Sequence, residues 1–179
     1  KPGDGNLIAR FRSQKPTQPP VLLIAHLDAV SASPFTWDTN PLQLVEKDGY
    51  YYGRGTRDIK GGAAMLVANF IRLKAEGFRP DRDLVLLFTA DEEYSGGNVD
   101  WLLKEHRPLI DAAFALNTDA GQVDLLPDGR PEIFGIQTAE KIYASFALEA
   151  SSPGGHSSRP GPDNAIYKLA RALARVEQH

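Results

Sequence analysis

The sequence predicts an α/β fold in which a mostly parallel sheet is flanked by helices, and three observations lead to this prediction. Short apolar runs such as Val21–Ala25 and Leu84–Phe88 are typical of strands that are buried on both faces of a sheet. An amphipathic segment with helical spacing, Gly62–Glu76, lies between these two runs. Strands that alternate with helices along a chain indicate parallel strands joined by helical crossovers.

The individual elements follow from apolar periodicity and from the Gly and Pro residues that interrupt it. Gly77 ends the first helix pattern, and a Pro-rich loop at Gln14–Pro20 separates the first two strands. Tyr50–Gly55 is typical of a short strand or a hairpin arm. Beyond these, we expect strands at Asn6–Arg12, Val21–Ala25, Asp83–Ala90 and Ala112–Leu116, and helices at Gly62–Glu76 and Asn98–His106.

The pattern changes near residue 139, where we expect a second domain to begin. Polar and apolar residues alternate over Ile142–Ala150, which predicts a half-buried antiparallel strand. A loop rich in Gly, Ser and Pro follows at Ser151–Pro160. Ala165–Val176 is amphipathic at helical spacing and predicts a helix. The chain therefore divides into residues 1–138 and the opening, residues 139–179, of an α+β domain.

Composition excludes several classes of function. The chain has 179 residues, 42% of them hydrophobic, and a net charge of −3, which gives no electrostatic basis for binding nucleic acid or an anionic membrane. Cysteine is absent, which excludes disulfides, thiolate metal sites and cysteine nucleophiles. The chain does not begin with Met, and we expect a fragment of a longer protein. The compartment stays open between the cytoplasm and the periplasm or exterior.

Acidic and imidazole side chains follow the predicted strands or begin the helix after them. In parallel neighbours such positions meet at one edge of the sheet, where α/β proteins bind ligands. Histidine nitrogen and carboxylate oxygen together suit a divalent cation such as Zn²⁺. Packed carboxylates repel one another, and two cations about 3.5–4 Å apart would offset that cost. The residues are His26, Asp28, Asp58, Glu92, Glu93 and Asp119.

Each of these residues also has an ordinary explanation when it is taken alone. Asp58 stands where an N-cap is expected, and Asp119 precedes Gly121 as a turn residue often does. Glu92-Glu93 alone is typical of a solvated acidic turn, and His156 in its flexible-looking loop is typical of an exposed histidine. Their joint placement at strand ends favours a two-metal hydrolytic site.

Taken together, the segments resemble the di-zinc aminoacylase/carboxypeptidase family of metallopeptidases, which includes acetylornithine deacetylase, succinyl-diaminopimelate desuccinylase and several dipeptidases. The resemblance spans nearly the whole chain and is specific as an ordered set. The matching segments are LLIAHLDAV, YGRGTRDIKGG, LLFTADEEYSGG, NTDAG and SSPGGHSSRPGPDNAI.

The resemblance implies a role for each matching residue. His26, Asp58 and Asp119 would hold one zinc ion, and Asp58 would bridge to a second, which Glu93 also binds. Co²⁺ or Mn²⁺ can substitute for Zn²⁺ in such sites. Glu92 would be the general base, and Asp28 would orient His26. The Asp58–Ile59 peptide bond would be cis.

The resemblance also implies a function for each of the two domains. Residues 1–138 would be the N-terminal part of a di-zinc catalytic domain, and residues 139–179 the beginning of a truncated lid or dimerisation domain. His156 would stabilise the oxyanion in a partner subunit's site, and the full-length protein would be a homodimer. The family's second zinc also needs a histidine in a late segment that this chain does not match. We expect that ligand beyond residue 179, so the chain alone would be inactive.

The expected reaction is zinc-dependent hydrolysis of an amide or peptide bond, as by a dipeptidase, a carboxypeptidase or an N-acyl-amino-acid amidohydrolase. Small peptides or N-acyl amino acids would be the substrates. The nearest alternative is a di-zinc aminopeptidase, whose bridging segment usually differs from Arg57–Gly62. A second alternative is a non-catalytic binding module that keeps the fold, against which the Glu92-Glu93 pair argues.

Overall fold

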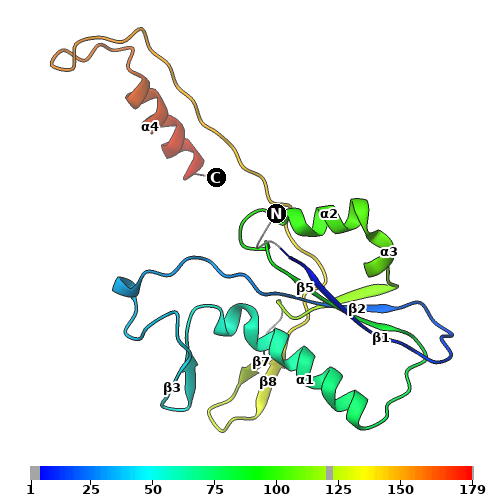
Figure 1. The fold of residues 1–179 in the computed structure, drawn as a ribbon. Coiled ribbons are helices and arrows are strands. Elements are labelled where there is room, and N and C mark those ends of the chain that lie inside the picture. Colours follow the sequence, from blue (N-terminus) through cyan, green and yellow to red (C-terminus); the bar gives the residue numbers. More distant parts are fainter. Residues whose placement is uncertain (1–4, 120–122, 179) are drawn as a thin grey trace. The chain divides into compact units, whose positions relative to one another are not determined.

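A computed structural model describes residues 5–119 and 123–178, and all structural statements refer to these residues. The chain forms two compact units, Lys1–Gln137 and Thr138–His179, which are described separately. The first unit contains the central sheet and most of the helices (Figure 1). Among the described residues, no helix is both long and apolar enough to cross a membrane.

The sheet of the first unit has four strands in the order β1-β5-β2-β6. Strand β2 (Val21–His26) pairs in parallel with β5 (Leu84–Thr89) and with β6 (Phe114–Asn117). Strand β1 (Leu7–Phe11) runs antiparallel to β5 at the sheet edge. The carboxyl ends of β2, β5 and β6 therefore lie at one edge, and the predicted α/β class with a mostly parallel sheet is confirmed.

Helices cover both faces of this sheet, because successive residues of a buried strand point to opposite sides. Helix α1 (Gly61–Ala75) lies on one side, and helices α2 (Gly97–Glu105) and α3 (Arg107–Ile110) lie on the other (Figure 1). The α1 face buries Ala25, Ile59, Ala63, Leu66, Leu86 and Phe88. The opposite face buries Leu22, Val85, Leu87, Leu102 and Ile110.

Two hairpins complete the first unit. Strands β3 (Val45–Lys47) and β4 (Tyr50–Tyr52) pair across Asp48 and Gly49, both at positive φ, which is the geometry of a two-residue hairpin turn. The hairpin arm predicted at Tyr50–Gly55 is thus confirmed over its first three residues, Tyr50–Tyr52. The second hairpin, β7 (Val123–Leu125) with β8 (Pro131–Phe134), was not predicted, although Asp-Gly in its turn is a known hairpin signal.

The second unit contains helix α4 (Ala165–Val176), which coincides with the predicted helix. Asn164 caps it by accepting a hydrogen bond from the Ile166 amide at 2.9 Å. The strand predicted at Ile142–Ala150 is wrong: the segment has no strand pairing, and Ile142 and Tyr143 are 95% and 90% exposed. Alternating polar and apolar residues are typical of a strand with one buried face. Such a strand needs a second strand to pair with, and the described residues of this unit contain none.

Asp83, just before β5, fastens β1 to the sheet. Its carboxylate accepts hydrogen bonds from the Ser13 amide at 2.8 Å and from Arg10 Nη1 at 3.1 Å. Arg10 Nη2 donates to the Leu109 carbonyl at 3.0 Å, which ties the same strand to α3. The Ser13 amide, and after it Arg10, lower the pKa of Asp83 against the opposing effect of burial. The ionised carboxylate is therefore bound more strongly than the protonated form.

We expect Asp83→Asn to lower the free energy of unfolding at neutral pH by roughly 1–2 kcal/mol, because an amide cannot replace a charged acceptor of two donors. The lowered pKa means that this stabilisation is present above the unfolded pKa of about 3.9 and is lost as pH falls through the folded value. Denaturant unfolding at several pH values should show the two proteins converging below about pH 4.

The matched control is Asp81→Asn, because Asp81 is a nearby aspartate whose side chain is 62% exposed and, among the described residues, pairs with Arg82 alone. This control should stay within about 0.5 kcal/mol of the parent. A constant difference between Asp83→Asn and the parent across the pH range would contradict the proposed role of the charge.

Candidate metal centre

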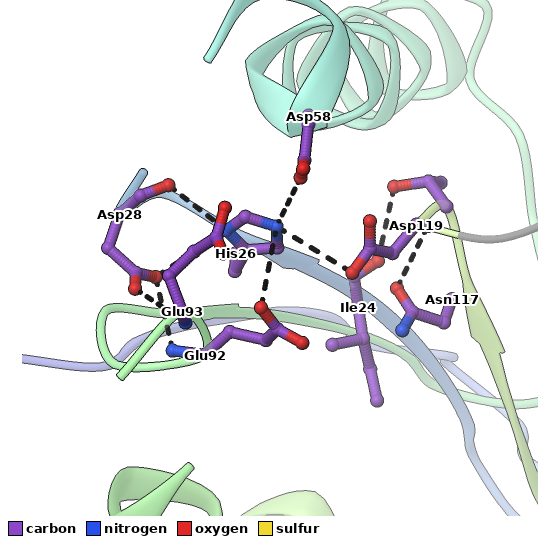
Figure 2. Close-up of polar contacts among 9 residues, drawn as sticks. Ile24, His26, Asp28, Asp58, Glu92, Glu93, Asn117 and Asp119 are labelled. Carbon is purple, nitrogen blue, oxygen red and sulfur yellow. Dashed lines mark hydrogen bonds and ion pairs between the residues drawn. The ribbon is translucent and has the colours of Figure 1, made fainter. Parts of the chain in front are cut away.

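His26 is the last residue of β2 and is 3% exposed, at the carboxyl edge of the sheet. Its Nδ1 lies 3.0 Å from the backbone oxygen of Asp28, and since that oxygen can only accept, Nδ1 carries the proton. Its Nε2 faces three carboxylates: Asp58 Oδ1 at 2.9 Å, Asp119 Oδ2 at 3.6 Å and Glu92 Oε2 at 3.9 Å. Figure 2 shows these groups around the ring.

Asp58 comes from η2 (Thr56–Lys60), the segment that leads into α1. Its peptide bond to Ile59 is cis, as the resemblance implies. Ile59 is 3% exposed and packs in the α1-face core, whereas the Asp58 side chain is 61% exposed and reaches His26. The buried Ile59 side chain thus anchors the segment in the core, and the adjacent Asp58 side chain lies at the carboxyl edge of the sheet beside His26.

Glu92 and Glu93 lie in the turn after β5, and the carboxylate of Asp28 holds that turn. The Glu93 amide donates to Asp28 Oδ2 at 2.9 Å, and the Glu92 amide donates to Oδ1 at 3.3 Å. Backbone pairing of the two strands continues until the Leu27 amide, which donates to the Thr89 carbonyl at 2.8 Å. The Asp28 side chain therefore continues the connection between the segments where the ladder stops.

Asp119 follows β6, whose end is fixed against both β2 and α1. The Thr118 amide donates to the Ile24 carbonyl at 3.1 Å, and the Asp119 amide donates to Asn117 Oδ1 at 3.1 Å. Gly62 in the first turn of α1 lies against Thr118, where an added Cβ would come within 2.6 Å of Oγ1. Because Gly62 has no side chain, the start of α1 and the end of β6 can approach closely.

The charges of these residues act on one another. Burial opposes protonation of His26, but the hydrogen bond with Asp58 and the charge of Asp119 outweigh it and raise the pKa of the imidazole. Burial raises the pKa of Glu92, and the negative charges of Asp119 and Glu93 add to this against the opposing effect of His26. Both shifts show that the cluster favours additional positive charge.

The donor set fits a divalent cation. Two groups have ligand atoms within 4.8 Å of one another, namely His26 with Asp58 and Asp119, and His26 with Glu92 and Glu93. With the proton on Nδ1, neutral His26 turns the lone pair of Nε2 toward carboxylate oxygens that also carry lone pairs. Only a second proton or a cation makes that arrangement attractive, and one nitrogen with several carboxylate oxygens is a ligand set typical of Zn²⁺.

The structure thus brings together six of the seven residues that the sequence singled out. The seventh, His156, belongs to the second unit, where its Nδ1 accepts hydrogen bonds from the amide of Ser158 at 3.2 Å and, in the tautomer that this requires, from Ser158 Oγ at 2.8 Å. His156 lines a cavity of about 420 Å³ at the start of α4, together with Arg159 and Asn164.

Sequence reasoning missed two contributors to the geometry. One is the backbone oxygen of Asp28, which is closer to His26 Nδ1 than the carboxylate, at 3.0 Å against 3.5 Å. No sequence signal distinguishes these two acceptors on the same residue. The other is the contact of Gly62 with Thr118, for which the paired glycines at the helix start were an available signal.

Comparisons with known proteins show which proteins this chain is similar to. The chain is 32% identical over 172 residues to the human N-fatty-acyl-amino acid synthase/hydrolase PM20D1, covering 94% of this chain and 34% of that protein. It is 36% identical over 166 residues to a probable succinyl-diaminopimelate desuccinylase of Staphylococcus aureus strain MRSA252, covering 92% of this chain and 37% of that protein. The chain therefore spans about a third of the length of these relatives.

Solved structures of similar fold include the di-peptidase Dug1p of Saccharomyces cerevisiae, with a TM-score of 0.56 and 27% identity over 68% of this chain and 26% of that one. Human carnosine dipeptidase 1 has a TM-score of 0.54 over 66% of this chain and 26% of that one, and at 24% identity it supports the fold alone. The model of peptidase family M20/M25/M40 matches residues 22–176. The chain belongs to this peptidase family.

Proposed function

We propose that the protein containing this chain hydrolyses an amide or peptide bond with the help of two zinc ions. The observation that carries the proposal is the buried Nε2 of His26, which is faced by carboxylates from three separate segments of the chain. Structural ion pairs rarely gather so many like charges around one imidazole, because the carboxylates repel one another unless cations offset their charge. Membership of a peptidase family supports the same conclusion.

The ligands divide between two cations. His26, Asp58 and Asp119 would hold the first, and Asp58 and Glu93 would contribute to the second. Zn²⁺ suits this set, and Co²⁺ or Mn²⁺ would substitute for it. A histidine from outside residues 1–179 would complete the second position. When bound, the pair of cations lowers the pKa of a water molecule and polarises the amide carbonyl.

Glu92 would move the proton. Its carboxylate lies 3.9 Å from His26 Nε2 and its side chain is 52% exposed, so it borders the ligands and remains accessible to water. Glu92 accepts a proton from the attacking water as the carbon–oxygen bond forms, and donates it to the amide nitrogen as the carbon–nitrogen bond breaks. A free carboxylate and a free amine result, and no covalent intermediate with the chain is required.

The second unit would supply the oxyanion donor. We propose that residues 1–138 are part of the catalytic domain and that residues 139–179 begin a lid or dimerisation domain. His156 in that domain would donate a hydrogen bond to the developing oxyanion of a partner subunit's substrate. Its Nδ1 is engaged by Ser158, which leaves Nε2 as the nitrogen available for donation. A homodimer of the whole protein is part of this proposal.

The substrates would be small peptides or N-acyl amino acids. The relatives include proteins named as acting on N-fatty-acyl amino acids and on a succinylated amino acid, and a di-peptidase has a similar fold. All three descriptions share an amide bond next to an amino acid. The aminopeptidase alternative and a non-catalytic binding module are less favoured, because the match to the family is continuous over residues 22–176 and retains both Glu92 and Glu93.

Zinc binding by the 179-residue chain tests the ligand assignment directly. We expect His26→Ala and Asp58→Ala each to weaken zinc binding by about 100-fold or more, because each removes a direct ligand. Competition with a chromophoric chelator measures the affinity. His106→Ala is the matched control, since His106 packs against Trp101 away from the cluster and its removal should leave the affinity unchanged. Equal affinities in all variants would contradict the assignment.

Activity of the whole protein tests the role of Glu92. Glu92→Gln keeps the size of the side chain but cannot accept the proton, so kcat/KM should fall about 10²–10⁴-fold with zinc content unchanged. Hydrolysis of N-acyl amino acids and dipeptides, followed by release of the free amine, provides the measurement. Glu105→Gln, an exposed glutamate at the end of α2, serves as the control. Retention of the parent rate by Glu92→Gln would disprove the proposed mechanism.

A further inference from the structure

We infer that the carboxylate of Asp28 is a positioning group for the Glu92-Glu93 turn, and that the backbone oxygen of Asp28 orients His26. The inference separates two functions of one residue and assigns them to different atoms. It concerns the geometry of the chain's own residues, and its relevance to catalysis rests on the proposed function.

The distances support this division. His26 Nδ1 lies 3.0 Å from the Asp28 backbone oxygen but 3.5 Å from the nearest carboxylate oxygen. The carboxylate instead accepts from two successive amides, Glu93 at 2.9 Å and Glu92 at 3.3 Å, one at each oxygen. A hydrogen bond at 3.0 Å is well within the usual range, and a contact at 3.5 Å is at its limit. The ring is therefore held by the main chain.

The sheet explains why the turn needs this support. Parallel pairing places His26 opposite Thr89, and the last backbone bond runs from the Leu27 amide to the Thr89 carbonyl. Beyond that point the chain of β5 turns, and the amides of Glu92 and Glu93 have no strand to pair with. Asp28, level with the start of the turn, supplies two acceptors in place of a neighbouring strand. Its side chain is only 12% exposed, so water competes weakly for these amides.

A carboxylate suits this function better than other side chains of the same size. Two convergent amide donors need two acceptor oxygens, and an ionised aspartate provides both. Asparagine would provide one oxygen and turn an NH₂ group toward the second amide. Ligand atoms of Glu92, Glu93 and His26 lie within 4.8 Å of one another, and the backbone of the turn determines how the two adjacent glutamates approach His26.

The test uses the 179-residue chain in its zinc-free form, with Asp28→Asn and Asp28→Ala. In ¹H–¹⁵N spectra we expect hydrogen exchange of the Glu92 and Glu93 amides to rise about 10-fold or more in Asp28→Ala, and that of at least one of the two to do so in Asp28→Asn. The Nδ1–H resonance of His26 should persist in both variants, because its acceptor is the main chain. Asp38→Asn, which removes an exposed charge remote from the cluster, is the control.

Zinc affinity provides the second measurement, taken together with the melting temperature of each variant. If Asp28 served stability alone, a variant with an unchanged melting temperature would also bind zinc with unchanged affinity. Both variants should bind zinc about 10-fold to 100-fold more weakly, the range found when a group that orients ligands is removed. Loss of the His26 Nδ1–H resonance with the two amides still protected would overturn the inference, as would unchanged zinc affinity. These outcomes do not depend on hydrolysis, so failure of the proposed function would be recognised separately.

Discussion

The centre depends on the way in which one buried imidazole is held. His26 is enclosed at the end of β2, and its Nδ1–H is fixed by a carbonyl oxygen of its own chain two residues further on. That contact leaves Nε2 as the nitrogen that faces the carboxylates. Rotation of the ring by half a turn would place Nδ1 among the acids and break the bond with the main chain. The carboxylates of Asp58, Asp119 and Glu92 face Nε2 only while the imidazole keeps this orientation.

The register of the sheet then determines which residues can reach that nitrogen. Ile24 pairs with Asn117, the last residue of β6, so Asp119, two positions beyond the strand, comes level with His26. On the other side His26 pairs with Thr89, and the turn after β5 comes level with Asp28. Side chains from three neighbouring strands thus meet at one height. Asp58 reaches the same point from the opposite direction, because Gly62 allows the start of α1 to approach Thr118.

The strand ends could be predicted from sequence, because apolar runs locate buried strands and parallel strands bring their carboxyl ends together. Asp58 was expected in the same cluster because it begins a helix, but the local backbone path that brings it to His26, anchored by Ile59, could not be predicted. Alternation alone also misled at Ile142–Ala150, where the polar pattern of a strand is present without a partner to pair with. Hydrogen-bond partners were the least predictable feature. Asp28 offers both a backbone oxygen and a carboxylate as acceptors, and the sequence does not indicate which of them His26 contacts.

The five acidic side chains of the centre have different electrostatic consequences. Both oxygens of Asp28 accept from neutral amides, so this carboxylate is engaged and adds negative potential without serving as a ligand. Its charge acts on Glu92 together with those of Asp119 and Glu93. The remaining carboxylates, at the rim, carry a net charge that neutral His26 does not offset. Positive charge close to these carboxylates offsets their repulsion, and the cations that we propose would supply it.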